Sequence, residues 1–458
     1  MSIQLLVAEV LRVLQHKHIL KPIYFLFLMV MAGGLVASCE TAKQPFAAGV
    51  GTDPTLPAPR KSMLPTVLIA PAKGWPEGAR PLAVSGTSVA TFATGLHHPR
   101  WIYVLPNGDV LVAETSAPPQ PKDNRGIKGW FIKKALKRIG AVVPSANRIT
   151  LLRDADGDGV AEVRTVLLDG LNSPFGMALV GSDFYVANTD AVIRFSYTTG
   201  MTRINAPGTK LADLLAGPIN HHWTKNLIAS RDGSKLYVTT GSNSNVGENG
   251  MDKEAGRAAI WEIDSTTGHS RIFASGMRNP NGLAWETVSG ALWTVVNERD
   301  ELGSDLVPDY LSTVKEDSFY GWPYSYYGQH VDERVKPPRP DLVAKAITPD
   351  YALGAHVAPL GLTWSGSNSL PAQFTSGMFI GQHGSWNRKP RSGYNVVFIP
   401  FSNGRPSGNP VEVLTGFVSA KGDAQGRPVG VAMDKRGALL VADDVGNVIW
   451  RVTAQTAR

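Results

Sequence analysis

Three polar side chains, Arg278, Asn279 and Asn281, surround one proline directly before an apolar run. Arginine and amide groups donate several hydrogen bonds, and arginine suits a carboxylate or a negative charge that develops during a reaction. A histidine, His222, stands earlier in the chain, and neutral imidazole is the usual general base near pH 7. These residue types fit a pocket that binds an anion and removes a proton from a substrate.

Other segments carry groups that complete such a pocket. The acidic stretch NERDELGSD contains Asp300 and Glu301, and oxygen atoms are the ligands that calcium prefers. The stretch HGSWNR contains Trp386 and Arg388, and Arg427 follows later. Each residue alone fits a surface or capping role equally well. The prediction of a site therefore rests on the set meeting at one place.

One further stretch, RDADGDGVAE, resembles a calcium loop at its start. Asp154, Asp156 and Asp158 fit the opening of an EF-hand loop, but Thr165 stands where that loop needs a glutamate. The flanking segments read as strands, which predicts an acidic hairpin turn, with a weak peripheral ion as the alternative. The sequence contains no GxSxG, HExxH, P-loop or GxGxxG motif, so serine or zinc hydrolysis and a nicotinamide cofactor lack support.

A repeated pattern indicates how these groups come together. Each copy has a small motif, an apolar strand, a glycine-containing turn and a second apolar strand. The copies begin at Gly95, Gly170, His221, Gly276, His356 and Gly426. Six such units predict an all-β fold, a six-bladed β-propeller with four-stranded blades. The small motif of each copy leads into the innermost strand, so its polar residues are expected at the mouth of the central channel.

The motifs also resemble a known family, the soluble quinoprotein sugar dehydrogenases and most of all the L-sorbosone dehydrogenase branch. The resemblance covers roughly residues 90–455, and RNPNGL at 278–283 is its most specific piece. FYGWPY at 319–324, HHWTKNL at 221–227 and NERDELGSD at 297–305 match further family segments. Members are six-bladed propellers that carry pyrroloquinoline quinone (PQQ) and calcium.

The resemblance implies a role for each candidate residue. The catalytic residues are His222 as the base, with Arg278 and Asn279. The cofactor-binding residues are Arg278, Asn279, Asn281, Trp386, Arg388 and Arg427. Calcium is bound at Asp300 and Glu301, through main-chain carbonyls in the family.

The chain departs from the family at several of these positions. His221 replaces an acidic residue, Asn387 or Arg388 stands where a lysine is expected, and Val429 replaces a second arginine. The calcium loop also lacks the family's Gly-Pro pair.

The implied function is PQQ-dependent oxidation of an aldose or sugar aldehyde, such as L-sorbosone or glucose, by hydride transfer from the sugar C1 to the quinone. The implied partners are a small sugar and an electron acceptor such as a cytochrome or a quinone. Two alternatives stay open: a calcium-dependent propeller lactonase, and a non-catalytic lipoprotein propeller that binds a partner.

The N-terminus predicts export and lipidation. Residues 1–39 read as a lipoprotein signal peptide, because basic residues precede an apolar run that ends in VASC with Cys39, the sole cysteine. An ordinary signal peptide that happens to contain Cys39 is the alternative. Residues 40–85 read as a proline-rich tether that partly wraps the body, and residues 86–458 as the catalytic propeller. The expected location is the periplasmic side of a bacterial membrane, with a lipid anchor at Cys39.

The formal net charge of +7 has a local source in the basic stretch 128–140. Its apolar residues share one helix face, which predicts either a docked insertion helix or a contact with anionic lipid. No basic platform with interleaved aromatic residues recurs along the chain, so nucleic acid is not an expected partner.

Overall fold

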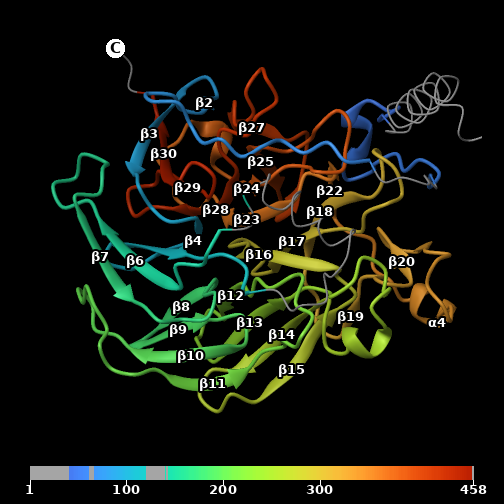
Figure 1. Ribbon diagram of the computed structural model, residues 1–458, viewed down its shortest axis with the longest axis horizontal. Helices are drawn as coiled ribbons and strands as arrows, with labels where there is room; N and C mark the ends of the chain where they lie inside the picture. Colours follow the sequence, from blue (N-terminus) through green and yellow to red (C-terminus); the bar gives the residue numbers. More distant parts are fainter. Residues whose placement is uncertain (1–40, 61–65, 120–139, 141–142, 456–458) are drawn as a thin grey trace, which may run out of the picture.

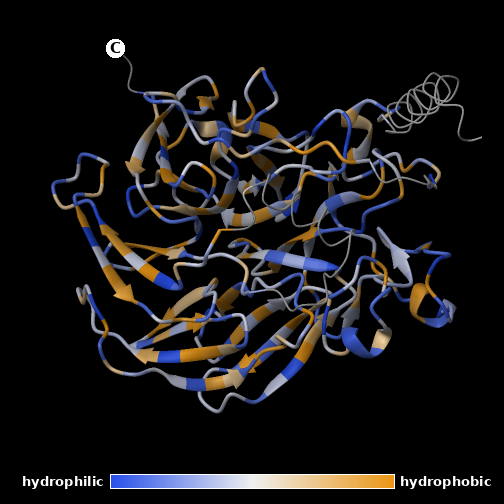
Figure 2. Cartoon of the chain, in the orientation of Figure 1, coloured by the Kyte–Doolittle hydropathy of each residue, from blue (hydrophilic) through white to orange (hydrophobic). Residues whose placement is uncertain are grey.

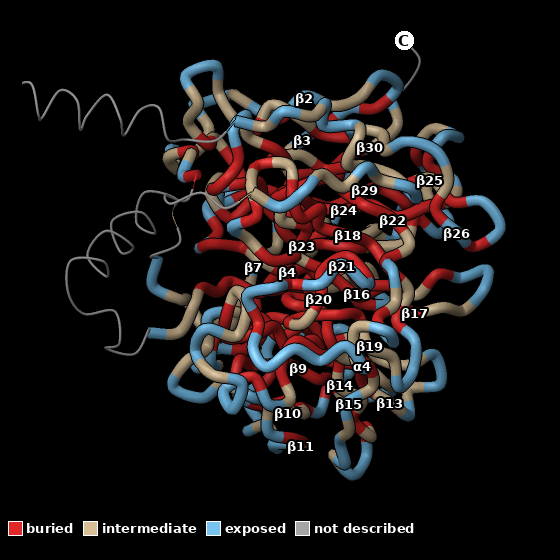
Figure 3. The backbone as a smooth tube through the Cα atoms, turned by 90° about the vertical axis from the view of Figure 1, so that its right-hand side faces the viewer, coloured by how far each residue is buried: buried red, intermediate tan, exposed pale blue. Residues whose placement is uncertain are grey.

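The protein is a six-bladed β-propeller, as the repeats predict (Figure 1). The computed structural model describes residues 41–60, 66–119, 140 and 143–455. Polar residues interrupt the hydrophobic residues along the blade strands (Figure 2), and the buried backbone is concentrated in the middle of the molecule (Figure 3). The hydrophobic clusters join strands of neighbouring blades, so adjacent blades share one core.

The six blades follow one another along the chain, and each begins at one of the predicted repeats. Blade 1 comprises β4 (Pro99–Val104), β5 (Val110–Glu114), β6 (Arg148–Arg153) and β7 (Val163–Leu168). Blade 2 comprises β8 (Met177–Val180), β9 (Asp183–Ala187), β10 (Ala191–Ser196) and β11 (Thr209–Asp213). Blade 3 comprises β12 (Leu227–Ala229), β13 (Lys235–Thr240), β14 (Ala259–Asp264), β15 (Ser270–Ser275) and the parallel strand β19 (Ser318–Phe319).

The later blades recruit strands from distant parts of the chain. Blade 4 comprises β16 (Asn279–Trp285), β17 (Leu292–Asn297), β18 (Pro308–Thr313), β22 (Tyr351–Ala355) and β1 (Val50–Gly51). Blade 5 comprises β23 (Pro359–Trp364), β24 (Gly377–Gln382), β25 (Asn395–Ser402), β26 (Arg405–Pro406), β27 (Val411–Thr415) and β2 (Leu82–Ala83). Blade 6 comprises β28 (Pro428–Met433), β29 (Leu439–Asp443), β30 (Val448–Ala454) and β3 (Thr87–Ala93). Because β3 precedes blade 1 and pairs with the last strand, this blade closes the ring.

The remaining elements are short connections. They are η1 (Phe46–Gly49), η2 (Met251–Glu254), β20 (Ser325–Tyr326), β21 (His330–Val331), α4 (Pro340–Val343) and η3 (Ala372–Phe374). Within the described residues, no helix is long and apolar enough to cross a membrane.

A proline and a glycine explain the repeated small motif. In four innermost strands, the pairing register shifts just after the proline, which is a β-bulge that re-aims the following side chain. In blades 4 and 5 a glycine stands two residues beyond that proline, and a Cβ on it would collide with the next blade. A Cβ on Gly282 would lie 2.6 Å from the Leu362 Cβ, and one on Gly361 would lie 2.1 Å from the Val429 oxygen. The glycine lets neighbouring inner strands approach, while the bulge directs polar residues toward the mouth.

The segment before the propeller differs from a free tether. Its residues 41–60 and 66–85, here called the strap, lie along blades 4, 5 and 6 (Figure 1). Ala70 joins the hydrophobic core between blades 5 and 6, and the Trp75 indole donates to the Asp443 carboxylate at 2.7 Å. Other apolar residues of the strap, Phe46, Val67 and Leu82, are exposed. The strap therefore packs through a few buried contacts and through the pairing of β1 with β22 and of β2 with β27.

Of three other predictions, one is confirmed and two concern residues that lie wholly or almost wholly outside the described part of the chain. The acidic stretch at Asp154 is the turn of the hairpin between β6 and β7, as predicted, and its four neighbouring carboxylates lie together there. Cys39 lies outside the described residues. So does the basic stretch 128–140 except for its last residue.

Candidate active site

Arg278 directly precedes β16, and its side chain reaches across the first hairpin of blade 4. Its side chain is almost fully buried, and one terminal nitrogen donates to the Glu298 carbonyl oxygen at 2.7 Å. The other lies 3.3 Å from the Asp300 carboxylate. The two strands of one hairpin thus bring the predicted arginine and the predicted acidic turn together.

His222 and Asn279 meet at a glycine. A Cβ on Gly241 would lie 2.5 Å from the His222 Cβ and 2.4 Å from the Asn279 Oδ1, so the backbone leaves no room for a side chain there. The next residue, Ser242, accepts from the His222 Nδ1 at 2.7 Å and donates its N–H to the Arg278 oxygen at 2.8 Å. The three predicted catalytic residues therefore converge on one short segment of blade 3.

The environment of His222 keeps its imidazole neutral. Burial lowers the pKa of His222 to about 3, and the positive charge of Arg278 acts in the same direction. The Ser242 carbonyl oxygen can only accept a hydrogen bond, so the proton of the neutral ring resides on Nδ1. The Nε2 lone pair is then available to accept a proton.

Asp300 is the centre of a charged group at the mouth. Its Oδ1 accepts from the Asn387 amide at 2.7 Å and lies 3.4 Å from the His356 Nδ1. Burial alone would raise the pKa of Asp300, but Arg278 and the contacts from His356 and Asn387 outweigh it and lower the pKa to about 2. We call His222, Arg278, Asn279, Asp300, His356 and Asn387 the mouth cluster. Glu301 points elsewhere, and its carboxylate accepts from Arg334 at 2.9 Å.

Several buried polar atoms of this region have no hydrogen-bond partner among the described residues. They are the Arg278 Nε, the Asn279 Oδ1 and the Asn281 Oδ1. The Asn281 amide nitrogen is held by the Thr224 hydroxyl at 3.2 Å, which fixes the orientation of its side chain. Buried polar groups are nearly always paired, so these atoms fit a site where a polar molecule supplies the missing partners.

The structure separates two residues of the HGSWNR stretch from the mouth cluster. The Arg388 guanidinium donates to the Ser304 and Pro390 carbonyl oxygens at 2.9 and 2.8 Å, and it lies over the Phe46 ring of the strap. Asn387, and not Arg388, is the neighbour that reaches Asp300. Trp386 is exposed, and its carbonyl oxygen accepts from the Leu68 N–H of the strap.

Arg427 belongs to a second cluster formed by blades 1, 5 and 6. Its guanidinium contacts the His383 Nδ1 at 3.4 Å and the Tyr394 hydroxyl at 3.1 Å. Asp444 accepts from Arg100 at 2.5 Å and from His383 at 2.9 Å. Burial lowers the pKa of His383 to about 4, although Asp444 acts in the opposite direction.

Trp223 contacts the second cluster and is the neighbour of His222 in the chain. The Arg100 guanidinium lies 6.0 Å from the Trp223 ring. The Arg100 Nε and the Arg427 Nε have no hydrogen-bond partner in the described part of the chain. Sequence reasoning missed Arg100, His356, His383 and Asp444, although each stands at the small motif or the second strand end of a repeat.

A family model described as TrAA12-like matches residues 141–317 and 341–455, which is more than half of the chain. The chain belongs to this family. This TrAA12-like chain has the same fold as several solved structures, although its sequence is less than 20% identical to theirs. A structure of Trichoderma reesei Carbohydrate-Active Enzymes Family AA12 aligns with a TM-score of 0.66 and 19% identity, covering 85% of this chain and 100% of that chain.

The PQQ domain of pyranose dehydrogenase from Coprinopsis cinerea, in its holo form, aligns with a TM-score of 0.64 and 19% identity over 84% of this chain and 100% of that chain. Two curated relatives match parts of this TrAA12-like sequence. A PQQ-dependent pyranose dehydrogenase of Coprinopsis cinerea is 22% identical over 69% of the chain and 44% of its own length. An uncharacterized protein of Borreliella burgdorferi is 33% identical over 48% of the chain and 57% of its own length. The chain spans about half the length of the curated relatives it matches.

Proposed function

We propose that this protein is a PQQ-dependent sugar dehydrogenase, which oxidises an aldose or a sugar aldehyde such as glucose or L-sorbosone. The observation that carries the proposal is the set of unpaired buried polar atoms in the mouth cluster. Those atoms belong to residues that the family resemblance assigns to the cofactor. The solved neighbours of this TrAA12-like chain include the PQQ domain of a pyranose dehydrogenase, which supports the proposal.

The unpaired nitrogens of Arg278 and Arg427 fit the chemistry of PQQ. Its three carboxylates and its quinone oxygens accept hydrogen bonds, which suits the Arg278 guanidinium on one side of the mouth and Arg427 on the other. The unpaired oxygens of Asn279 and Asn281 accept hydrogen bonds, so they suit the hydroxyl groups of the bound sugar. When bound, PQQ would supply the two-electron oxidation of the sugar, because no protein side chain performs that chemistry.

The chain's own residues then move the proton and hold the charge. His222 takes the proton of the sugar hydroxyl at Nε2, since its Nδ1 proton is committed to the Ser242 oxygen. Arg278 and Asn279 donate toward the position where negative charge develops, as an oxyanion hole does. Asp300 holds Arg278 in place through its carboxylate.

Calcium enters the proposal through backbone oxygens. Both carboxylate oxygens of Asp300 already contact Arg278, His356 and Asn387, and the Glu301 carboxylate faces Arg334. The main-chain carbonyls of Asp300 and Glu301 are therefore the ligands we propose. The Asp300 carbonyl oxygen accepts from the Asn245 amide at 3.2 Å, which leaves its second lone pair for Ca²⁺. Glu301 has a φ of 70°, in the left-handed region that few residues other than glycine adopt. Such an outlier is common where backbone is shaped for a ligand.

Of two further residues in the predicted cofactor set, Arg388 has another proposed role and Trp386 keeps its predicted role. Arg388 holds the backbone at Ser304 and Pro390, so we propose that it shapes the acidic loop from behind. Trp386 stays a proposed cofactor contact, because its exposed ring leaves a large apolar surface for a planar ligand.

We further propose that the protein is held by a lipid at Cys39 on the periplasmic side of a bacterial membrane. The electron acceptor is then a cytochrome or a quinone. Mass spectrometry of the mature N-terminus tests the anchor, and an unmodified residue 40 or an intact Met1 would contradict it.

One assay separates the proposed function from its alternatives. The apo-protein is loaded with PQQ and Ca²⁺, and dye reduction is measured with a panel of aldoses beside hydrolysis of sugar lactones. Sugar-dependent dye reduction that requires PQQ supports a dehydrogenase. Lactone hydrolysis without PQQ would favour a lactonase, and neither activity would favour a non-catalytic binding protein.

A further inference from the structure

A cavity of about 210 Å³ lies beside the mouth cluster and belongs to different loops. Loops of blades 1 and 2 and the connection between blades 2 and 3 form it. Its lining includes Pro118, Asn172, Asp190, Pro218, Asn220 and His221. His221 directly precedes the proposed base, yet His222, Arg278 and Asn279 are not part of the lining. The cavity therefore adjoins the proposed reaction point without containing it.

The wall of this cavity is held in place by Arg257, which is buried. Its guanidinium donates to the Leu215 oxygen at 3.0 Å and to the Asn220 Oδ1 at 3.2 Å. The same group donates to the Gly241 oxygen at 3.1 Å, and Gly241 is the residue against which His222 packs. One arginine thus fixes the cavity wall relative to the proposed base.

A second set of bonds links the wall to blade 2. The Asn220 amide donates to the Thr189 hydroxyl at 2.8 Å, and that hydroxyl donates to the Trp223 oxygen at 2.9 Å. These contacts cross between the loop before His222 and the end of β9. A cavity with walls fixed in this way is pre-organised, so a ligand need not order the loops when it binds.

The lining has the composition of a carbohydrate subsite. Asp190 and Asn172 are exposed polar groups that can bond hydroxyls, and His221 adds an imidazole. Pro118, Pro119, Pro218 and Ile219 supply apolar surface for the C–H face of a sugar ring. Small-molecule sites typically combine apolar walls with a few polar groups of this kind. The volume is below the roughly 300–1,000 Å³ of a whole ligand pocket, so it suits one added sugar unit.

We propose that this cavity binds the sugar unit next to the one that is oxidised, so that the preferred substrate is a reducing disaccharide or longer oligosaccharide. The inference rests on the proposed function and names its substrate class. The terminal unit presents its C1 hydroxyl to His222, and the second unit passes over His221 into the cavity. Asp190 accepts hydrogen bonds from hydroxyls of that second unit.

The test compares sugars of different length on the PQQ- and calcium-loaded enzyme. Maltose, cellobiose and lactose are compared with glucose, and KM and kcat are measured for the parent protein and Asp190→Asn. We expect at least one disaccharide to have the lower KM in the parent. Asp190→Asn should raise that KM about tenfold, as for loss of a bond to a charged group, and leave the glucose KM within twofold. Asp213→Asn is the matched control, since Asp213 lies on β11 outside the cavity and pairs with Lys210.

Two results would overturn the inference: no disaccharide binds better than glucose, or Asp190→Asn changes both KM values equally. A second readout separates it from the proposed function. Saturation-transfer NMR with the same sugars on the apo-protein should show disaccharide contacts that Asp190→Asn removes. If PQQ fails to bind, the proposed function fails, and this readout alone decides whether the cavity binds sugar. No disaccharide contact in it would overturn the cavity assignment.

Discussion

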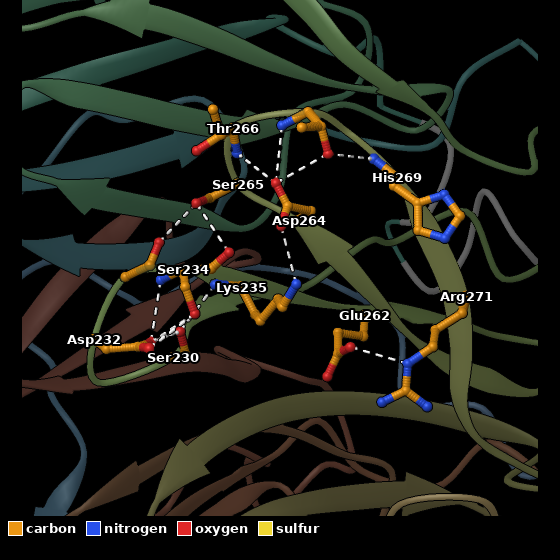
Figure 4. A network of polar contacts seen from close by, with 12 residues as sticks. Ser230, Asp232, Ser234, Lys235, Glu262, Asp264, Ser265, Thr266, His269 and Arg271 are labelled. Carbon is orange, nitrogen blue, oxygen red and sulfur yellow. Dashed lines mark hydrogen bonds and ion pairs between the residues drawn. The ribbon is translucent and has the colours of Figure 1, made fainter.

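The mouth cluster and the outer edge of blade 3 carry similar residue types, but they differ in burial and in hydrogen bonding. At the edge, shown in Figure 4, the Asp264 Oδ1 accepts from the Thr266 and Thr267 N–H groups at 3.1 and 2.9 Å, and its Oδ2 accepts from Lys235 at 2.9 Å. Arg271 donates to Glu262 at 3.0 Å. These bonds close the turns of a hairpin and face solvent.

The mouth cluster differs in being mostly buried and incompletely paired. The Arg278 Nε and the Asn279 Oδ1 lack partners among the described residues, while every acid of the edge network has several. Unpaired polar atoms are expensive only where water cannot reach them. Unused hydrogen-bonding capacity, and not the density of charged residues, thus distinguishes the proposed ligand site from the hairpin turns of blade 3.

Changing His222 should have the largest effect on turnover. His222→Gln removes the base and leaves Gly241 and Ser242 in place, so the fold and PQQ binding should persist. Turnover should fall by about 100- to 10,000-fold, the usual contribution of general base catalysis. Steady-state dye reduction measures it, and His221→Gln is the control with a smaller expected loss. Loss of activity in His221→Gln alone would shift the base by one residue.

Changing Arg278 should weaken both the rate and the cofactor affinity. Arg278→Ala removes a donor toward the developing charge, and loss of one such donor typically lowers kcat by about 100-fold or more. Arg271→Ala at the edge of blade 3 removes an arginine with equally good ion pairs and should leave kcat unchanged. If both variants lowered kcat equally, the proposed functional difference between the mouth cluster and the edge of blade 3 would be wrong.

The protonation of His222 gives a pH test of the same comparison. Burial lowers the pKa of His222 to about 3, so the ring should stay neutral in the folded apo-protein down to that pH. The unfolded chain binds this proton below about 6.5, so acid between these values should lower stability. NMR titration of the imidazole, with His222→Gln for assignment, should show no transition between pH 5 and 8. A midpoint near 6.5 would mean that water reaches the ring.

The smallest effect is expected at the edge network. Asp264→Asn should leave sugar oxidation unchanged and lower Tm slightly at neutral pH. Hydrogen bonds from Thr267 and Lys235 hold the pKa of Asp264 below its usual range. Its contribution to stability is therefore present above the unfolded pKa near 3.9 and is lost as the pH falls through the lower, folded value. Thermal unfolding at pH 7 and pH 3 should show a smaller difference between variant and parent at the lower pH.

The sequence predicted what is local and repeated. The proline, glycine and hairpin turns recur within each blade, which made the propeller readable, and RNPNGL placed Arg278 and Asn279 at the mouth. The strap was harder to read, because the partners of Ala70 and Trp75 lie in the last two blades, far away in the sequence.

Contacts between distant repeats could not be read at all. Arg100 and Asp444 form an ion pair across the ring closure, and His356 meets Asp300 from the following blade. The sequence also left Asn387 and Arg388 as alternatives. The backbone turns between them, so Asn387 faces Asp300 while Arg388 faces Ser304.

The most direct measurement is a calorimetric titration of PQQ into the apo-protein, with and without Ca²⁺, followed by quinone absorbance. We expect saturable, calcium-dependent binding that Arg278→Ala weakens strongly and Arg271→Ala leaves unchanged. No heat and no spectral change with Ca²⁺ or any other divalent metal tested would contradict the assignment of the mouth cluster as a quinone site.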